Sequence, residues 1–166
     1  MTIQKTLVID AIALERKITR MAWELYERHF SESHLVMVGI SNSGYTLAGR
    51  IAEKIQQISP LSVQLLELSV NKRAPQKGPT TLHASLEVLD NQAVVVIDDV
   101  LNAGTTLIYA VQYLLNAPVR RMTTAVLVDR NHKSFPIKAD VKGLSLSTSL
   151  HDQVDVSWEE NAVYLR

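Results

Sequence analysis

The sequence predicts an α/β fold, a twisted and mostly parallel sheet flanked by helices. The short, mostly apolar runs at 35–40, 93–98 and 122–128 are typical of strands that are covered on both faces. Segments with apolar residues at helical spacing lie between these runs, so strands and helices alternate along the chain. We expect one domain, 1–166, because this length suits a single core and the chain contains no repeat or linker.

Two amphipathic helices are predicted in the first third of the chain. Asp10 can cap a helix that continues to about Phe30, and a second helix follows the polar turn at 41–44. Apolar residues spaced by three or four mark their buried faces: Ile18, Met21, Ala22 and Leu25 in the first, Ala48, Ile51, Ala52 and Ile55 in the second. The strand at 35–40 lies between the two helices.

The middle of the chain is predicted to hold two strands and a loop. Residues 61–70 alternate and then shift phase at Leu65–Leu66, which predicts a strand with a bulge or a bend. Proline, glycine and several cations at 71–80 predict a long mobile loop. Residues 83–89 are predicted to form an edge strand, closed by a turn at 90–91.

A third helix is predicted between the buried strands at 93–98 and 122–128. It is marked by Leu107, Ile108, Val111, Leu114 and Leu115. The remaining tail mixes short apolar pieces with turns and ends in AVYLR.

Composition disfavours several classes of function. The formal net charge is zero, which argues against a broad surface for binding nucleic acid. The chain has no cysteine, so disulfides and thiolate metal sites are excluded and a reducing compartment is suitable. The first residues lack the apolar core of a signal peptide, and no run of about 20 apolar residues could span a membrane. We therefore expect a cytoplasmic protein.

Residues 94–106, VVVIDDVLNAGTT, place two adjacent acids at the end of a buried strand. Burying carboxylates is costly unless they are paired or hydrogen-bonded, so the pair suggests a ligand, although a bare acid pair can also end a strand and cap a turn. The turn at 102–106 offers backbone N–H groups, a glycine and two hydroxyls to a phosphate. Asp98 and Asp99 can accept hydrogen bonds from sugar hydroxyls or hold Mg²⁺. The segment therefore predicts a sugar-phosphate site.

The same segment resembles the phosphoribosyl-pyrophosphate (PRPP) signature of type I phosphoribosyltransferases. It matches neither GxxxxGK[ST] nor GxGxxG. Segments 9–28, 38–55, 125–140 and 143–149 follow in the order and spacing of one family, and VDRNHKSFPIKAD is the most discriminating piece. Together they resemble the bifunctional pyrimidine operon attenuation protein/uracil phosphoribosyltransferase family over nearly the whole chain. The resemblance implies the type I phosphoribosyltransferase fold, with a small hood built from the terminal segments and a mobile loop.

The resemblance also implies an activity and a set of site residues. The activity is Mg²⁺-dependent transfer of phosphoribose from PRPP to uracil, which gives UMP and pyrophosphate. Asp98 and Asp99 would bind the ribose hydroxyls and Mg²⁺. The implied PRPP-binding residues are these acids and Asn102, Ala103, Gly104, Thr105, Thr106, Ser41, Asn42, Ser43 and Gly44. The segment with Asp129, Arg130 and His132 would help to form the nucleobase pocket; without the resemblance, Arg130 suggests a surface ion pair and His132 a solvated turn.

The sequence departs from the family on the pyrophosphate side. Family members carry basic residues in the turn at 41–44, where this chain has none, and Thr105 stands where an arginine is often found. Backbone N–H groups and hydroxyls can still bind pyrophosphate. Lys72 and Arg73, with Lys77, could supply the missing charge by closing over the site, and Lys72 aligns best with a loop arginine of the family. A solvated, charged loop is the equal alternative.

The sequence disfavours the RNA-binding role that the resemblance also implies. Thr19 and Arg20 match the helix that contributes to the RNA-binding face, but Trp23 replaces an expected histidine. Leu144 and Leu150 stand where cations are expected. Trp23 would suit the interface of a homodimer or a higher homo-oligomer. Three interpretations stay open: a uracil phosphoribosyltransferase, a PRPP- or nucleotide-binding regulator with weak or no catalysis, and a phosphoribosyltransferase for another nucleobase.

Overall fold

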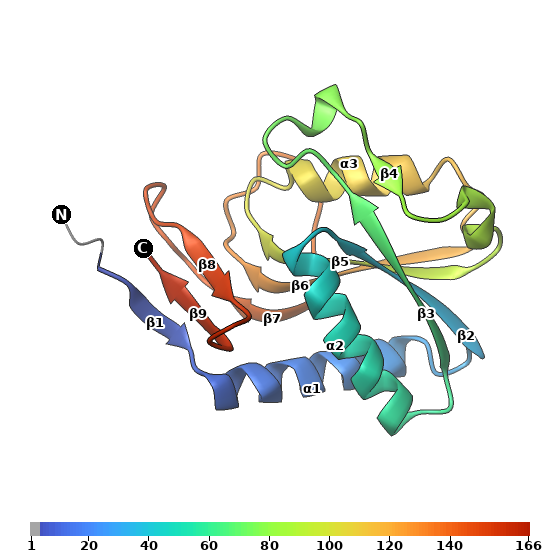
Figure 1. Cartoon of the computed structure of the whole chain (residues 1–166), viewed down its shortest axis with the longest axis horizontal. Coiled ribbons are helices and arrows are strands. Elements are labelled where there is room, and N and C mark those ends of the chain that lie inside the picture. The colour runs from blue at the N-terminus through green and yellow to red at the C-terminus, as the bar shows by residue number, and fades with distance from the viewer. Residues whose placement is uncertain (1–3) are drawn as a thin grey trace.

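A computed structural model describes residues 4–166 and confirms the predicted fold class (Figure 1). The central sheet has the strand order β4-β3-β2-β5-β6-β7, and all neighbours are parallel except β3 and β4. Its strands are β2 (His34–Ile40), β3 (Ser62–Ser69), β4 (Thr81–Leu82), β5 (Ala93–Leu101), β6 (Arg121–Asp129) and β7 (Val141–Ser145). The carboxyl ends of the parallel strands therefore meet at one edge, where a ligand site is expected.

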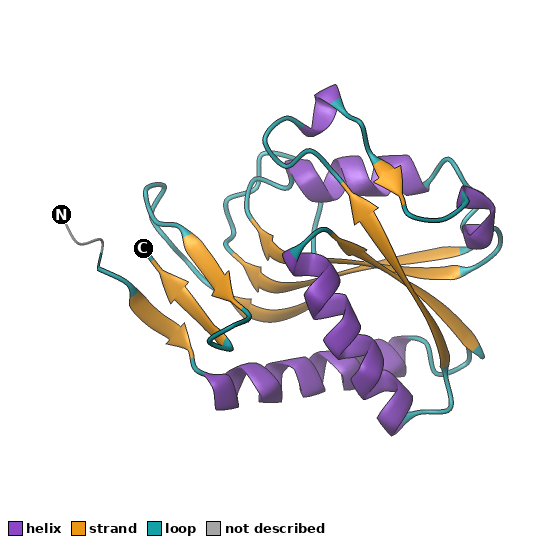
Figure 2. Cartoon of the chain, viewed as in Figure 1, coloured by secondary structure: helices purple, strands orange, loops and turns teal. Residues whose placement is uncertain are grey.

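Helices cover both faces of this sheet (Figure 2). The helices α1 (Ala11–Arg28) and α2 (Ser43–Ile58) share one hydrophobic cluster with the strands, and α3 (Thr105–Leu114) belongs to a second cluster on the opposite face. Asp10 caps α1 as predicted, since its carboxylate accepts a hydrogen bond from the Ala13 backbone N–H at 2.8 Å. Alternate residues of the buried strands serve the two clusters, because successive side chains point to opposite faces.

The two ends of the described chain form a small antiparallel sheet, coloured blue and red in Figure 1. Its order is β1-β9-β8, with β1 at Thr6–Ile9, β8 at Val154–Ser157 and β9 at Ala162–Leu165. Ile9 and Val163 are buried in the cluster of α1 and α2, so this sheet shares the main core. The hood expected from the terminal segments is therefore present.

The predicted bulge in β3 is wrong. β3 pairs with β2 without interruption, from His34 opposite Ser62 to Ile40 opposite Leu68. The two adjacent leucines shift the phase because both faces of β3 are covered: Leu65 packs on the cluster of α1 and α2, and Leu66 on the cluster of α3. Two apolar neighbours in sequence thus reflect a strand with two covered faces.

The predicted edge strand at 83–89 is also wrong. The strand here is β4, only two residues long, and Leu86–Leu89 form a 3-10 turn, η2. The Ser85 hydroxyl accepts a hydrogen bond from the Glu87 N–H and starts this turn, which competes with an extended strand. The loop before β4 contains a second 3-10 turn, η1 (Pro75–Lys77).

Within residues 4–166, no helix is long and apolar enough to cross a membrane.

Candidate active site

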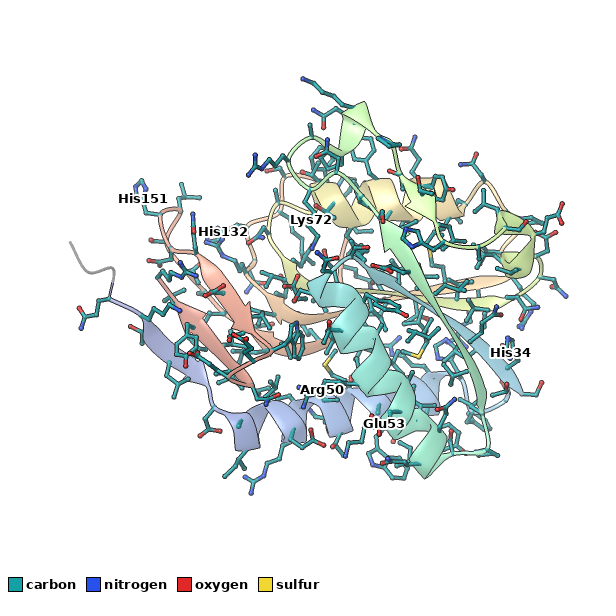
Figure 3. The ribbon with its side chains drawn as sticks, viewed as in Figure 1. His34, Arg50, Glu53, Lys72, His132 and His151 are labelled. Atoms are coloured by element: carbon teal, nitrogen blue, oxygen red, sulfur yellow. The ribbon has the colours of Figure 1, made fainter. Side chains whose placement is uncertain are left out.

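A cavity of about 170 Å³ lies beside the carboxyl end of β5. It is lined by Lys72, Asp98, Val100, Leu101, Asn102, Ala103, Gly104, Thr105, Thr106, Leu107 and Val126. The structure therefore brings together one predicted acid, the whole predicted phosphate loop and one predicted loop cation. Figure 3 places Lys72 and His132 toward one end of the sheet and His34 at the other.

The two acids lie within the last part of β5, which continues three residues beyond the predicted end. Asp98 is 3% exposed, and its carboxylate accepts hydrogen bonds from the Asp99 N–H at 2.9 Å and from Lys72 Nζ at 3.0 Å. Lys72 Nζ also lies 3.7 Å from Asp99 Oδ1. One ammonium group from the loop after β3 thus bridges both carboxylates and satisfies charges that would otherwise be buried without a partner.

Burial and the neighbouring carboxylate of Asp99 raise the pKa of Asp98 to about 7, although Lys72 opposes this shift. Burial would lower the pKa of Lys72, but attraction to Asp98 and Asp99 outweighs it and raises that pKa. The acid pair is therefore stabilised by positive charge. A cation or a set of hydroxyl donors placed there would favour the ionised form of Asp98.

The phosphate loop joins β5 to α3 and has one position that requires glycine. Gly104 has φ +90°, and a Cβ at this position would lie 2.5 Å from Ile137 Cγ2. The Ala103 carbonyl accepts hydrogen bonds from the N–H groups of Ser134 at 2.8 Å and Phe135 at 3.2 Å, which fix the loop. Thr105 and Thr106 begin α3, so its first N–H groups and two hydroxyls are available at the cavity.

The turn at 41–44 joins β2 to α2 and adjoins the acid pair without lining the cavity. A Cβ on Gly44 would lie 2.9 Å from Asp98 Oδ1, so only glycine allows this close approach. The hydroxyl of Ser41 donates to Glu67 Oε1 at 2.7 Å, and that of Ser43 accepts from Trp158 Nε1 at 2.7 Å. Asn42 is the N-cap residue of α2, but its side chain makes no capping hydrogen bond.

Asp129 is the last residue of β6, and Arg130 and His132 follow it at the same edge of the sheet; none of the three lines the cavity. Asp129 is 1% exposed; burial would raise its pKa, but the Asn131 N–H, Lys133 and Lys142 outweigh this effect and lower it. These contacts make Asp129 an internal anchor of its segment.

Arg130 connects three parts of the site. Its guanidinium donates to Asn102 Oδ1 at 2.8 Å in the phosphate loop, to Thr148 Oγ1 at 3.0 Å and to the Asp152 carbonyl at 2.6 Å. A ring nitrogen of His132 bonds the Thr148 carbonyl. These side chains hold the segment around 148–152 beside the loop at 102–106. Arg73 differs from these residues, because its side chain is exposed and its backbone N–H donates to Asn71 Oδ1 at 3.2 Å.

Sequence reasoning missed Glu67, Ser69 and His83, which contact or adjoin Ser41. Glu67 and Ser69 are two residues apart in β3, and that spacing places them on one face of a strand. This spacing was the available signal. His83 lies far from both residues in sequence, and no sequence pattern indicated its position.

A parallel sheet with an acid pair and a glycine-containing strand–turn–helix loop at its carboxyl edge is typical of α/β proteins that bind nucleotides or sugar phosphates. The family model of the phosphoribosyl transferase domain matches residues 8–161, and the chain belongs to this family, as a type I phosphoribosyltransferase. It is similar to the bifunctional protein pyrR of Enterococcus faecalis, with 32% identity over 162 residues, 92% of this chain and 89% of that protein. The bifunctional protein PyrR of Streptococcus mutans is 34% identical over 155 residues, 92% of this chain and 88% of that protein.

Solved structures of similar fold include two hypoxanthine phosphoribosyltransferases. That of Trypanosoma cruzi has a TM-score of 0.81 and 12% identity, and covers 96% of this chain and 95% of its own. That of Staphylococcus aureus has a TM-score of 0.75 and 18% identity, and covers 95% and 90%. At these identities the likeness supports the fold and not the choice of base.

Proposed function

We propose that this chain transfers phosphoribose from PRPP to uracil, with Mg²⁺, and releases UMP and pyrophosphate. The observation that carries the proposal is the cavity in which Asp98 faces the phosphate loop 102–106. Uracil is favoured over other bases by the similarity to proteins named PyrR and by the segment at 125–140. We treat residues 1–166 as one functional domain.

The two ends of a phosphoribose group would be bound by different chemistry. The first N–H groups of α3 and the hydroxyls of Thr105 and Thr106 suit the 5′-phosphate, which needs no lysine or arginine at such a helix end. Asp98 and Asp99 can accept hydrogen bonds from the ribose hydroxyls. Their negative charge would also stabilise the positive charge that develops at C1′ as the bond to pyrophosphate breaks.

The acid pair fits Mg²⁺. Among residues 4–166, no group of three or more His, Cys, Asp or Glu side chains could hold a metal without further ligands. Mg²⁺ commonly uses one or two carboxylates together with substrate oxygens and waters, and Asp98 and Asp99 provide such a pair. The contact of both acids with Lys72 Nζ supports a preference for positive charge at this point. When bound, the ion would neutralise charge on PRPP.

Lys72 would have to leave the acids when PRPP binds. Its side chain is 40% exposed and belongs to the loop before η1, so it can move without disrupting the core. We propose that Lys72 and Arg73 then face the pyrophosphate, where the turn at 41–44 offers no cation. Closure of this loop would also exclude water from the reacting centre.

The proposed base pocket lies next to the phosphate loop, in the segment of Asp129, Arg130 and His132. Since Arg130 and His132 already bond the chain at Asn102 and Thr148, we assign them the role of holding the pocket wall. Backbone groups of that wall would then contact the base.

The experiment that tests the function is an assay of pyrophosphate release from PRPP and Mg²⁺ with uracil, with hypoxanthine, guanine, adenine and orotate in parallel. We expect turnover with uracil. Turnover with another base alone would keep the transfer chemistry and contradict the proposed specificity. Unchanged turnover in Asp99→Asn would contradict the role given to the acid pair.

A second candidate is a PRPP- or nucleotide-binding regulator with weak or no catalysis. The turn at 41–44 favours it, because the missing cations weaken the grip on the leaving pyrophosphate. Binding of PRPP or UMP without turnover on any base would support this candidate and contradict the first.

RNA binding is the less favoured form of that regulator. Cations of α1 contact carbonyls in or next to β7, the edge strand of the sheet: Arg20 donates to Gly143 O at 2.7 Å, and Arg28 donates to Asp140 O at 3.1 Å. These contacts assign the cations a structural role at the sheet edge. Binding of RNA at nanomolar concentration, with an affinity that falls as salt is added, would contradict this view.

We also propose that the chain forms a homodimer or a higher homo-oligomer. Two large apolar side chains of α1 are exposed, Trp23 at 44% and Ile12 at 67%. Trp23→Ala would then shift the mass measured by light scattering toward the monomer. Cytoplasmic location stays a prediction.

A further inference from the structure

A hydrogen-bonded cluster of four side chains lies behind the turn at 41–44. Ser41 Oγ donates to Glu67 Oε1 at 2.7 Å and lies 3.4 Å from Ser69 Oγ. Ser69 Oγ bonds His83 Nε2 at 2.8 Å, and His83 Nδ1 lies 3.5 Å from Glu67 Oε2. The Ser41 N–H also donates to the Leu68 carbonyl at 2.9 Å, so the turn is fixed to β3.

This cluster creates a problem for an anionic ligand at the turn. Ser41 has one hydroxyl proton, and it is committed to Glu67. If Ser41 donated instead to a diphosphate oxygen, the Glu67 carboxylate would lose its partner next to a second anion. The Glu67 carboxylate and the bound diphosphate would repel each other, and the turn carries no cation to compensate.

We propose that protonated His83 is the positive charge that allows this turn to accept diphosphate. The inference rests on the proposed function, because it assumes that the pyrophosphate of PRPP lies at the turn. An imidazolium donates from both ring nitrogens, from Nε2 to Ser69 and from Nδ1 toward Glu67. It neutralises Glu67 and releases the Ser41 proton for the ligand. His83 is thus a positioning residue that acts through Glu67 and Ser69.

The surroundings of His83 are simple enough for this role to be tested. Within residues 4–166, Glu67 is the only acid within 4.0 Å of its ring nitrogens. The His83 N–H donates to the Glu67 carbonyl at 2.9 Å, which fixes its backbone to β3. On the neighbouring α3, the titratable Tyr113 accepts a hydrogen bond from the Leu82 N–H at 3.4 Å. The His83 side chain is 49% exposed, so solvent protons reach it freely.

The test uses inorganic pyrophosphate as the probe and the full chain as the protein. Binding would be measured by calorimetry from pH 5.5 to 8.5 in wild type, His83→Gln and Glu67→Gln. We expect wild-type binding to weaken by about tenfold from pH 5.5 to pH 8.5, because the charge that neutralises Glu67 is then lost. His83→Gln should bind weakly, and the part of the pH dependence due to His83 should vanish. Glu67→Gln should keep its affinity at pH 8.5, because no carboxylate then needs neutralising.

His34 offers a matched control. It also bonds a serine of β3, Ser62 Oγ at 3.3 Å, but at the opposite end of the sheet (Figure 3). His34→Gln should therefore leave the pH profile of pyrophosphate binding unchanged. In NMR at constant pH, the imidazole resonances of His83 should shift when pyrophosphate binds, and those of His34 should stay constant.

The outcomes separate this inference from the proposed function. A pH profile of His83→Gln equal to that of wild type, or unchanged His83 imidazole resonances on binding, would overturn the role of His83 alone. If wild-type protein bound no pyrophosphate at any pH and gave no turnover with any base, both proposals would fall.

Discussion

Two turns of this protein have the same strand–turn–helix architecture but differ in what their hydroxyl groups contact. Residues 102–106 join β5 to α3, and residues 41–44 join β2 to α2, on adjacent strands of one sheet. The first turn presents N–H groups and hydroxyls to a cavity. The second has its hydroxyls bonded to Glu67 and Trp158. We propose that the first turn needs no side-chain cation to bind a phosphate, whereas the second depends in part on charge from outside the turn, on Lys72 and His83.

The largest effect should come from the acid that adjoins both turns. Asp98→Asn removes a buried charge near the proposed reacting centre, so we expect turnover to fall by about 10²–10³-fold, as for other electrostatic groups in active sites. Asp90→Asn is the control, because Asp90 is exposed and far from the cavity. Steady-state kinetics with PRPP and uracil measure both. Comparable rates in Asp98→Asn and Asp90→Asn would contradict the assignment.

The second prediction concerns pH and the protein without ligand. Folding raises the pKa of Asp98 from 3.8 to about 7, so the folded state holds a proton that the unfolded chain releases. The free energy of unfolding should therefore fall as pH rises from about 4 to about 7, by up to about 4 kcal/mol from this residue. Urea unfolding should show this slope in wild type and Asp90→Asn, and a reduced slope in Asp98→Asn. Identical slopes in all three proteins would refute it.

The third prediction tests whether the loop cation serves the diphosphate turn. Lys72→Gln removes the ammonium that bridges the acids, so pyrophosphate affinity should fall by about tenfold or more. Lys77→Gln is the control in the same loop, since Lys77 does not line the cavity. Calorimetry at two salt concentrations measures the effect. Equal losses in the two variants would indicate a general effect of loop charge.

The smallest effect should come from the phosphate-loop glycine. Gly104→Ala places a Cβ at φ +90° and against Ile137, which should lower stability by about 1–2 kcal/mol and weaken PRPP binding. Gly49→Ala is the control, because its Cβ would lie 3.6 Å from Leu65 Cδ2 inside a helix, where alanine stabilises by up to about 1 kcal/mol. Thermal unfolding should shift in opposite directions for the two variants.

The same two turns explain what the sequence could and could not predict. The phosphate loop and its acids were predictable because the strand, the acids, the glycine and the threonines form one continuous segment of the sequence. The surroundings of the turn at 41–44 were not predictable, because Glu67 and Trp158 bond its hydroxyls from two separate segments, and His83 is connected to it only through Ser69 and Glu67. The spacing of apolar residues predicted the buried helices and strands, because that spacing follows from which faces of an element are covered. It failed at Leu65–Leu66, where both faces are covered, and at 83–89, where Ser85 starts a turn.

The most direct test of this account compares two probes on two variants. Ribose 5-phosphate and pyrophosphate represent the two ends of the proposed substrate, and calorimetry gives their affinities in Gly104→Ala and Ser41→Ala. The account predicts that Gly104→Ala lowers the affinity for ribose 5-phosphate and keeps the affinity for pyrophosphate within about twofold. Ser41→Ala should lower the affinity for pyrophosphate by about tenfold, the value of one hydrogen bond near a charge, and keep the affinity for ribose 5-phosphate within about twofold. Equal losses of both probes in both variants would contradict the separate roles of the two turns.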